Sequence, residues 1–134
     1  MVLKSEILPV RESGDVVTVR QTVRLWAREA GFSLVDQTKL ITAASELARN
    51  MVDYGQGGTA TLEVLNDAAR TGLRVTFEDK GPGIPDVELA MRNGYTTGDG
   101  LGLGLGGAKR LVNEFDIRSR PGEGTRVVIT RWRT

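Results

Sequence analysis

The segment Asp79-Lys80-Gly81-Pro82-Gly83-Ile84-Pro85 and the run from Gly94 to Gly107 hold nine of the seventeen glycines in this 134-residue chain. Between Gly98 and Gly107, six residues in ten are glycine. Glycine weakens regular structure, so this density indicates either a flexible linker or a backbone that must approach a ligand closely. We expect too little sequence after Gly107 to form a second domain. We therefore interpret the two clusters as loops that hold a nucleotide.

Length and composition predict a single domain over residues 1–134. The chain has no cysteine and no histidine, which excludes disulfides, thiolate chemistry and a histidine base. The formal charge of +1 argues against nucleic acid or an anionic membrane as a partner. No apolar run approaches the ~18 residues that span a bilayer, so we expect a cytoplasmic protein. Five arginines near the end are predicted to lie on a solvated strand face: Arg118, Arg120, Arg126, Arg131 and Arg133.

The spacing of apolar side chains predicts both strands and helices. Alternation indicates strands, and apolar residues at three- and four-residue steps indicate helices. The predicted elements are a strand over 2–10, helices over 15–30 and 33–54, strands over 59–65 and 72–78, a short helix over 86–93, a helix over 106–114, and strands over 115–120 and 125–132. This order predicts an α+β fold, a two-layer sandwich with helices on one face of a mostly antiparallel sheet.

The predicted helix over 33–54 has an apolar side and a polar side. Ser33 and Asp36 resemble a capping box at its start. The apolar side holds Leu40, Ile41, Ala44, Leu47, Ala48 and Met51, and the polar side holds Lys39, Thr42, Glu46, Arg49, Asn50 and Asp53. Glu46 and Asn50 are neighbours one turn apart, although a polar helix face is usually only solvated. In the preceding helix, the row Arg20, Arg24 and Arg28 is either a solvated face or a docking surface.

The second glycine cluster does not match the common nucleotide motifs. Ala108 stands where a P-loop requires lysine, and the G-x-G-x-x-G match at Gly102 to Gly107 does not follow a predicted strand. The H-R-D and D-F-G motifs of protein kinases are absent as well. Small residues that lead into a helix at Gly104–Ala108 nevertheless leave N–H groups available for phosphate oxygens.

Four motifs follow one another along nearly the whole chain: Glu46-Leu47-Ala48-Arg49-Asn50, Asp79-Lys80-Gly81-Pro82-Gly83-Ile84, Gly100-Leu101-Gly102-Leu103-Gly104-Leu105 and Gly122-Glu123-Gly124-Thr125. They resemble the N box and the three glycine boxes of the GHKL superfamily, which groups gyrase, Hsp90, histidine kinases and MutL. Four boxes in register are far more specific than one. The resemblance implies the GHKL (Bergerat) ATP-binding fold.

Shorter matches narrow the resemblance: Val35-Asp36-Gln37, Lys109-Arg110-Leu111 and Asn113-Glu114-Phe115. They are similar to the RsbT-like switch kinases of the bacterial stressosome, small serine/threonine kinases of the anti-sigma type. Because the chain has no histidine and no predicted dimerisation helix pair, a histidine kinase is excluded.

The resemblance assigns roles to individual residues. Glu46 would accept the proton of a substrate serine, and Asn50 would hold Mg²⁺, for which an amide oxygen is a suitable ligand. Asp79 would accept a hydrogen bond from the adenine amine, with Thr125 assisting directly or through water. Gly81 and Gly83 would let the backbone pass beneath the base.

The resemblance also implies a phosphate end. The residues that would wrap the phosphates are Gly100, Leu101, Gly102, Leu103, Gly104, Leu105 and Gly106. Many relatives carry a basic residue or histidine three or four positions after the asparagine, whereas here Asp53 and Tyr54 stand there. Arg49, Lys109 and Mg²⁺ are the candidates for neutralising the γ-phosphate.

The implied function is an ATP-dependent serine/threonine protein kinase of a partner-switching stress-signalling module. It would use Mg-ATP to phosphorylate a STAS-domain antagonist or scaffold, and would then be released to a downstream regulator such as a phosphatase or cyclase. One alternative is an anti-sigma factor that sequesters a sigma factor in an ATP-dependent manner. Another is a simple ATPase without a protein substrate. We expect a monomer or a homodimer.

Overall fold

The computed structural model describes residues 1–91 and 104–133. Its elements in chain order are β1 (Val2–Val10), α1 (Ser13–Glu29), α2 (Leu34–Asp53), β2 (Gly58–Asp67), β3 (Arg70–Asp79), α3 (Val87–Ala90), α4 (Leu105–Arg110), β4 (Glu114–Arg120) and β5 (Gly124–Trp132). Every predicted strand is present, and the two long helices lie where the apolar spacing placed them.

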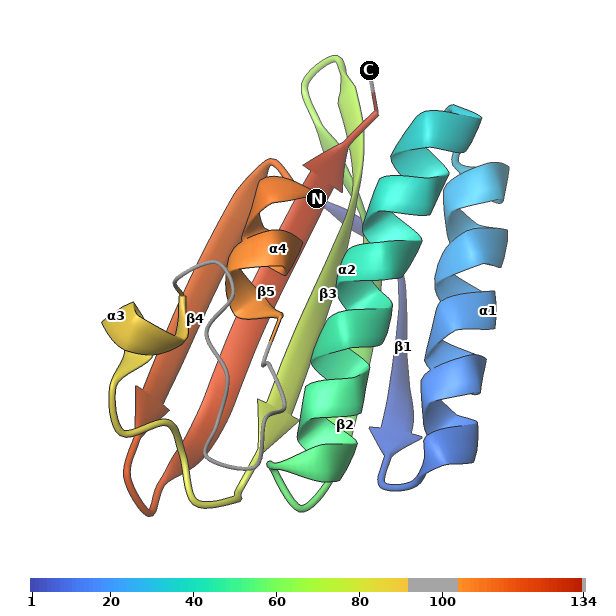
Figure 1. Cartoon of the computed structure of the whole chain (residues 1–134). Coiled ribbons are helices and arrows are strands. Elements are labelled where there is room, and N and C mark those ends of the chain that lie inside the picture. Colours follow the sequence, from blue (N-terminus) through green and yellow to red (C-terminus); the bar gives the residue numbers. More distant parts are fainter. Residues whose placement is uncertain (92–103, 134) are drawn as a thin grey trace.

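The strands of the described ranges form one antiparallel sheet in the order β1-β2-β3-β5-β4. The hairpins β2–β3 and β4–β5 each pair neighbours in the sequence, and β5 inserts between β3 and β4. All labelled helices lie on the same side of this sheet (Figure 1). The predicted α+β two-layer sandwich is confirmed.

The core lies between the sheet and the helix layer. In α1 the side chains Val16, Val19, Val23 and Trp26 are buried at three- and four-residue steps, as one face of a helix requires. The sheet contributes alternate residues, because successive strand side chains point to opposite faces. On β2 and β3 these are Ala60, Leu62, Leu73, Val75 and Phe77. This packing fixes α2 directly above the centre of the sheet.

The structure corrects the predicted ends of two helices. α1 begins at Ser13 rather than Asp15, because the Asp15 carboxylate accepts hydrogen bonds from the backbone N–H groups of Arg11 and Glu12 and caps an earlier turn. α4 ends at Arg110, so the predicted helix to residue 114 is wrong there. Asn113 N instead donates to Thr130 O, and Glu114 already pairs with β5.

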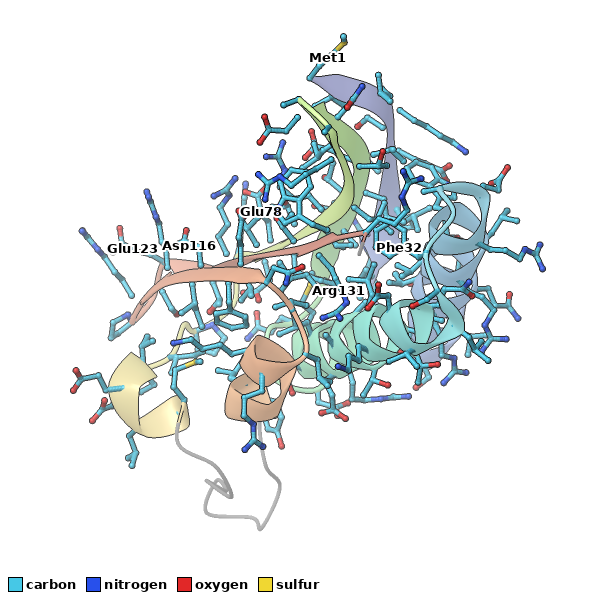
Figure 2. All side chains as sticks on the ribbon, turned by 90° about the horizontal axis from the view of Figure 1, so that it is seen from above. Met1, Phe32, Glu78, Asp116, Glu123 and Arg131 are labelled. Atoms are coloured by element: carbon cyan, nitrogen blue, oxygen red, sulfur yellow. The ribbon has the colours of Figure 1, made fainter. Side chains whose placement is uncertain are left out.

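The structure also corrects the prediction for one C-terminal arginine. Arg118, Arg120, Arg126 and Arg133 are exposed, whereas Arg131 is only 9% exposed. Seen from above, Glu78, Asp116 and Glu123 lie on the open side of the sheet, and Arg131 lies on the helix side (Figure 2). Because β5 has helices on one face only, the alternation of its side chains turns Arg131 toward α2.

The arginine row that was predicted on the first long helix lies on the surface of α1. Arg20, Arg24 and Arg28 are exposed on α1, and none forms an ion pair within the described part of the chain. Both interpretations of this row therefore stay open.

Over residues 1–91 and 104–133, no helix combines the length and the apolar character that crossing a membrane requires.

Candidate functional site

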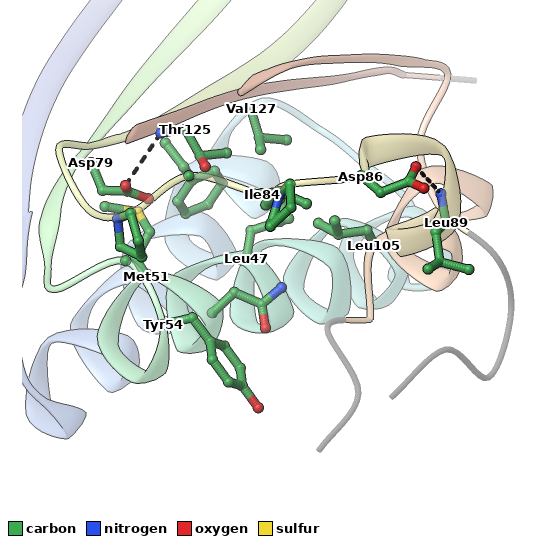
Figure 3. Close-up of a pocket in the computed structure, with 16 residues that line it drawn as sticks. Leu47, Met51, Tyr54, Asp79, Ile84, Asp86, Leu89, Leu105, Thr125 and Val127 are labelled. Carbon is green, nitrogen blue, oxygen red and sulfur yellow. Dashed lines mark hydrogen bonds between the residues drawn. The ribbon is translucent and has the colours of Figure 1, made fainter. Parts of the chain in front are cut away.

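A cavity of about 370 Å³ opens between α2, the segment that follows β3, and the start of β5. This volume lies within the range of small-molecule sites. Figure 3 shows Asp79 and Thr125 at one end and Asp86, Leu89 and Leu105 at the other. The residues that line the cavity are Leu47, Asn50, Met51, Tyr54, Gly55, Phe77, Asp79, Pro82, Gly83, Ile84, Pro85, Asp86, Leu89, Leu105, Thr125 and Val127.

Asp79 is the acidic group at the end of the cavity that also holds Thr125, which we call the inner end. It is the last residue of β3, and its Oδ1 accepts hydrogen bonds from Gly81 N at 2.9 Å and Thr125 N at 3.2 Å. Burial raises the pKa of the Asp79 carboxyl above its ordinary value, and the two backbone hydrogen bonds oppose that rise. The carboxylate is therefore held in one orientation and offers a ligand only acceptor oxygens when ionised.

The turn after Asp79 is packed against two other backbones. A β-carbon on Gly81 would lie 2.5 Å from Gly55 O, and one on Gly83 would collide with Arg120 O. Gly83 also has φ +76°, a conformation that side chains disfavour. Pro82 O accepts a hydrogen bond from Gly122 N at 2.7 Å, which ties this turn to the β4–β5 hairpin. Contacts inside the protein therefore require glycine at both positions. This requirement is separate from the predicted passage of the backbone beneath a base.

One side of α2 forms the floor of the cavity. Leu47 and Met51 are buried there, and Asn50 is half-buried at the boundary between the apolar and polar sides of the helix. One turn earlier, Glu46 lies against the N-cap of α4, because a β-carbon on Gly104 would collide with Glu46 Oε2. The structure therefore brings Glu46 and Asn50 from α2 to the same region as Asp79, Thr125 and Leu105.

A family model for the histidine kinase-, DNA gyrase B- and HSP90-like ATPases matches residues 35–133. This range spans the α2 face, the Asp79 turn and the β4–β5 hairpin that together form the cavity. The chain belongs to this ATPase family. The serine/threonine-protein kinase RsbT of Bacillus subtilis is 46% identical to it over 118 residues, which cover 88% of this chain and 89% of that protein. The chain is therefore an RsbT-like serine/threonine-protein kinase homologue.

Three further matches have lower sequence identity. An anti-sigma F factor of a Thermoanaerobacter species is 28% identical over 118 residues, covering 84% of this chain and 82% of that protein. Among solved structures, the RsbU and RsbW domains of a Mycobacterium tuberculosis protein give a TM-score of 0.68 at 22% identity, covering 98% of this chain and 33% of that one. The catalytic domain of histidine kinase ThkA gives a TM-score of 0.55 at 17% identity, covering 96% of this chain and 97% of that one. Both structures share the GHKL ATPase fold.

Some residues that we expected at the ATPase site lie elsewhere or were not described. Arg49 is exposed and its Nη1 donates to Ser13 Oγ at 3.3 Å, so in this structure it points to α1 rather than to the cavity. Lys109 is exposed on α4, and Gly106 is buried in the same helix. Gly100, Leu101, Gly102 and Leu103 lie outside the described residues. The phosphate roles of these residues stay predictions.

Sequence reasoning missed the apolar walls and one glycine of the site. Phe77 and Val127 line the cavity, but each belongs to a strand pattern that also fits an ordinary core. Gly55 touches the acidic group, since a β-carbon there would lie 2.5 Å from Asp79 Oδ2. The Tyr54 hydroxyl is buried with no hydrogen-bond partner within the described chain. A buried, unpaired hydroxyl beside a cavity is consistent with a ligand that completes it.

The groups around the cavity also fit Mg-ATP. Within residues 1–91 and 104–133, no cluster of three or more acidic side chains could hold a metal ion by itself. Mg²⁺ in nucleotide sites usually has one or two protein ligands, with phosphates and water completing its coordination. A single amide from Asn50 suits that arrangement. The apolar walls beside Asp79 suit a flat base that carries one amino group.

Proposed function

We propose that residues 1–134 form one ATP-binding kinase unit that phosphorylates a STAS-domain protein on serine or threonine. After the transfer, the kinase would be released to a downstream regulator such as a phosphatase or cyclase. The observation that carries the proposal is the convergence of Asn50, Asp79 and Thr125 on one cavity, with Glu46 one helical turn from Asn50. The relationship to RsbT supports the same proposal.

At the inner end of the cavity, the base would lie between the apolar floor of α2 and the turn after Asp79. Asp79 would accept the hydrogen bond of the adenine amine, and Thr125 would assist. Leu47, Met51 and Ile84 provide apolar contacts for the faces of the ring. This assignment explains why a carboxylate is kept half-buried at a cost that shows in its raised pKa.

At the outer end, Asn50 would hold Mg²⁺, which supplies charge neutralisation for the phosphates when it is bound. Glu46 would accept the hydroxyl proton as the serine oxygen bonds to the γ-phosphorus, while the bond to the β-phosphate oxygen breaks and ADP leaves. Positioning and charge neutralisation provide most of the catalysis in phosphoryl transfer. The region 100–106 would wrap the phosphates, with Lys109 or Arg49 as candidate contacts.

The test incubates the purified chain with labelled Mg-ATP and candidate STAS-domain proteins, followed by mapping of the phosphorylated residue. We expect label on one serine or threonine of a STAS protein. Glu46→Gln is the matched control, because it removes the base and keeps the size of the side chain. Nucleotide binding without transfer to any STAS protein, together with capture of a sigma factor, would favour the second candidate. That candidate is an ATP-dependent anti-sigma factor, which the anti-sigma F relatives at 27–30% identity support.

A further inference from the structure

Ser119, on β4, joins the two glycine boxes that flank the adenine end of the cavity. Its Oγ accepts a hydrogen bond from Ile84 N at 2.7 Å and donates to Gly124 O at 3.1 Å. The same oxygen lies 2.8 Å from Thr125 Oγ1. Ser119 does not line the cavity itself, whereas Ile84 and Thr125 do. Ser119 is therefore placed behind the site and in contact with two residues of its wall.

The proton count at Ser119 fixes the direction of these hydrogen bonds. A serine hydroxyl has one proton to donate and two lone pairs that accept. Gly124 O is a carbonyl and can only accept, so the 3.1 Å contact requires the proton of Ser119. The two lone pairs of Ser119 then receive the N–H of Ile84 and the O–H of Thr125. This arrangement satisfies every group, whereas the reverse direction would place two acceptor oxygens against each other.

The consequence for Thr125 is that the direction of its hydroxyl hydrogen bond is fixed. Its only hydroxyl proton is directed to Ser119, so toward the cavity Thr125 Oγ1 presents lone pairs alone. The neighbouring backbone N–H groups of Gly81 and Thr125 both donate to Asp79 Oδ1. The corner formed by Asp79 and Thr125 therefore offers acceptors from both side chains. A ligand group that faces this corner has to be a donor.

We propose that Ser119 is a positioning residue for base selection: by holding the Thr125 hydroxyl as an acceptor, it makes the site prefer 6-amino purines over 6-oxo purines. This inference rests on the proposed nucleotide function. A 6-oxo purine would place its carbonyl oxygen against the Asp79 carboxylate and the Thr125 lone pairs. Without Ser119, the Thr125 hydroxyl can rotate and donate to that carbonyl. The preference for the amino base then falls, although Asp79 still opposes the oxo base.

The experiment measures the affinities of ADP and IDP by calorimetry in Mg²⁺ buffer for wild type, Ser119→Ala, Ser119→Thr, Thr125→Val and the double variant Ser119→Ala/Thr125→Val. IDP differs from ADP at the 6-position, where a carbonyl replaces the amine and N1 gains a proton. We expect Ser119→Ala to lower the ratio of ADP to IDP affinity about five- to tenfold, the scale of one neutral hydrogen bond. Ser119→Thr keeps a hydroxyl and should keep the ratio.

The double variant separates base selection from a merely structural role. If Ser119 acts through Thr125, the ratio in the double variant equals that in Thr125→Val alone. A structural role alone would weaken ADP and IDP equally and leave the ratio at the wild-type value, which overturns the inference. Equal affinity of the wild type for ADP and IDP overturns it as well, while the nucleotide function stands. A wild-type chain that binds neither nucleotide overturns the proposed function and this inference together.

Discussion

Arg131, near the end of β5, donates to Asp36 Oδ1 in the first turn of α2, from Nε at 3.1 Å and from Nη2 at 2.6 Å. The two residues lie 95 positions apart in the sequence and are both buried. Arg131 Nη1 also donates to Leu111 O, at the C-cap of α4, at 2.9 Å. One guanidinium therefore ties together the sheet, the helix that carries Glu46 and Asn50, and the helix that begins beside Glu46.

Breaking this pair should destabilise the fold strongly. We expect Arg131→Met to lower the free energy of unfolding by about 3–5 kcal/mol, because it removes the guanidinium that donates to the buried Asp36 carboxylate. The double variant Asp36→Leu/Arg131→Met should recover most of the loss, since no buried charge then remains. The measurement is urea denaturation followed by circular dichroism.

The matched control for the buried pair is Asp116→Asn, at an exposed ion pair with Arg118 on the open side of the sheet. Exposed pairs contribute less than about 1 kcal/mol, so this variant should unfold close to wild type. If Arg131→Met unfolds like Asp116→Asn, the buried pair does not hold the layers together.

Removing the charge of Asp79 should weaken nucleotide binding. We expect Asp79→Asn to lower ATP affinity by about 1.5–3 kcal/mol, or roughly ten- to a hundredfold, because a hydrogen bond to a charged acceptor is lost. Isothermal titration calorimetry measures the change. Unaltered affinity would rule out Asp79 as the group that binds the adenine amine.

The same variant should alter how stability depends on pH. The pKa of Asp79 is raised on folding, so its favourable contribution is fully present below the unfolded value of about 3.9 and is lost as the pH rises through the folded pKa. Asp79→Asn does not titrate. Its stability relative to wild type should therefore increase as the pH rises from strongly acidic to neutral. Denaturant titrations at several pH values test this. A difference in the free energy of unfolding, variant minus wild type, that falls as the pH rises would contradict the raised pKa.

Glu46→Ala should separate binding from transfer. Glu46 is exposed and lies beside Gly104 rather than on the cavity wall, so its loss should leave Mg-ATP affinity within about twofold of wild type. The rate of phosphate transfer to the STAS protein should fall by about 10²–10⁴, the range for a positioned base. Transfer at the wild-type rate would mean that another group accepts the proton.

A methyl group at Gly55 should disturb the position of the Asp79 carboxylate. We expect Gly55→Ala to weaken ADP binding by about tenfold or more, because the new β-carbon lies 2.5 Å from Asp79 Oδ2 and must displace the carboxylate. Gly14→Ala is the control, since a β-carbon there has nothing within 4 Å. Calorimetry with ADP compares the two, and equal affinities would show that the Asp79 position is not critical.

The fold was predictable to a large extent because its main signals are local. Apolar alternation in 72–78 and helical spacing in 15–30 reflect a chain that has one buried face per element. Element ends were less predictable. Asp15 caps a helical turn that begins before Asp15 itself. The predicted last helix ends early because Glu114 pairs with Thr130. That pairing depends on β5, which follows later in the chain.

The candidate site divides in the same way. Glu46, Asn50, Asp79 and Thr125 could be named from the sequence because their motifs are short and contiguous. Gly55 and Ser119 could not, since their role exists only through contacts with Asp79 and with Ile84 and Thr125. The walls Phe77 and Val127 carry the same apolar pattern as any core strand.

The amino-acid sequence by itself determined the two layers, the family motifs and the chemical groups available for catalysis, because these depend on residue type and on spacing along one element. Only the tertiary structure decided that Arg131 is buried against Asp36 and that Arg49 points to α1. It also decided that Ser119 stands behind Thr125. These contacts depend on the order of the strands in the sheet and on the face of each strand that is turned to the helices. Strand register and the packing of the two layers determine that order and that face. Both involve residues that are far apart in the sequence, so no local sequence pattern predicts them.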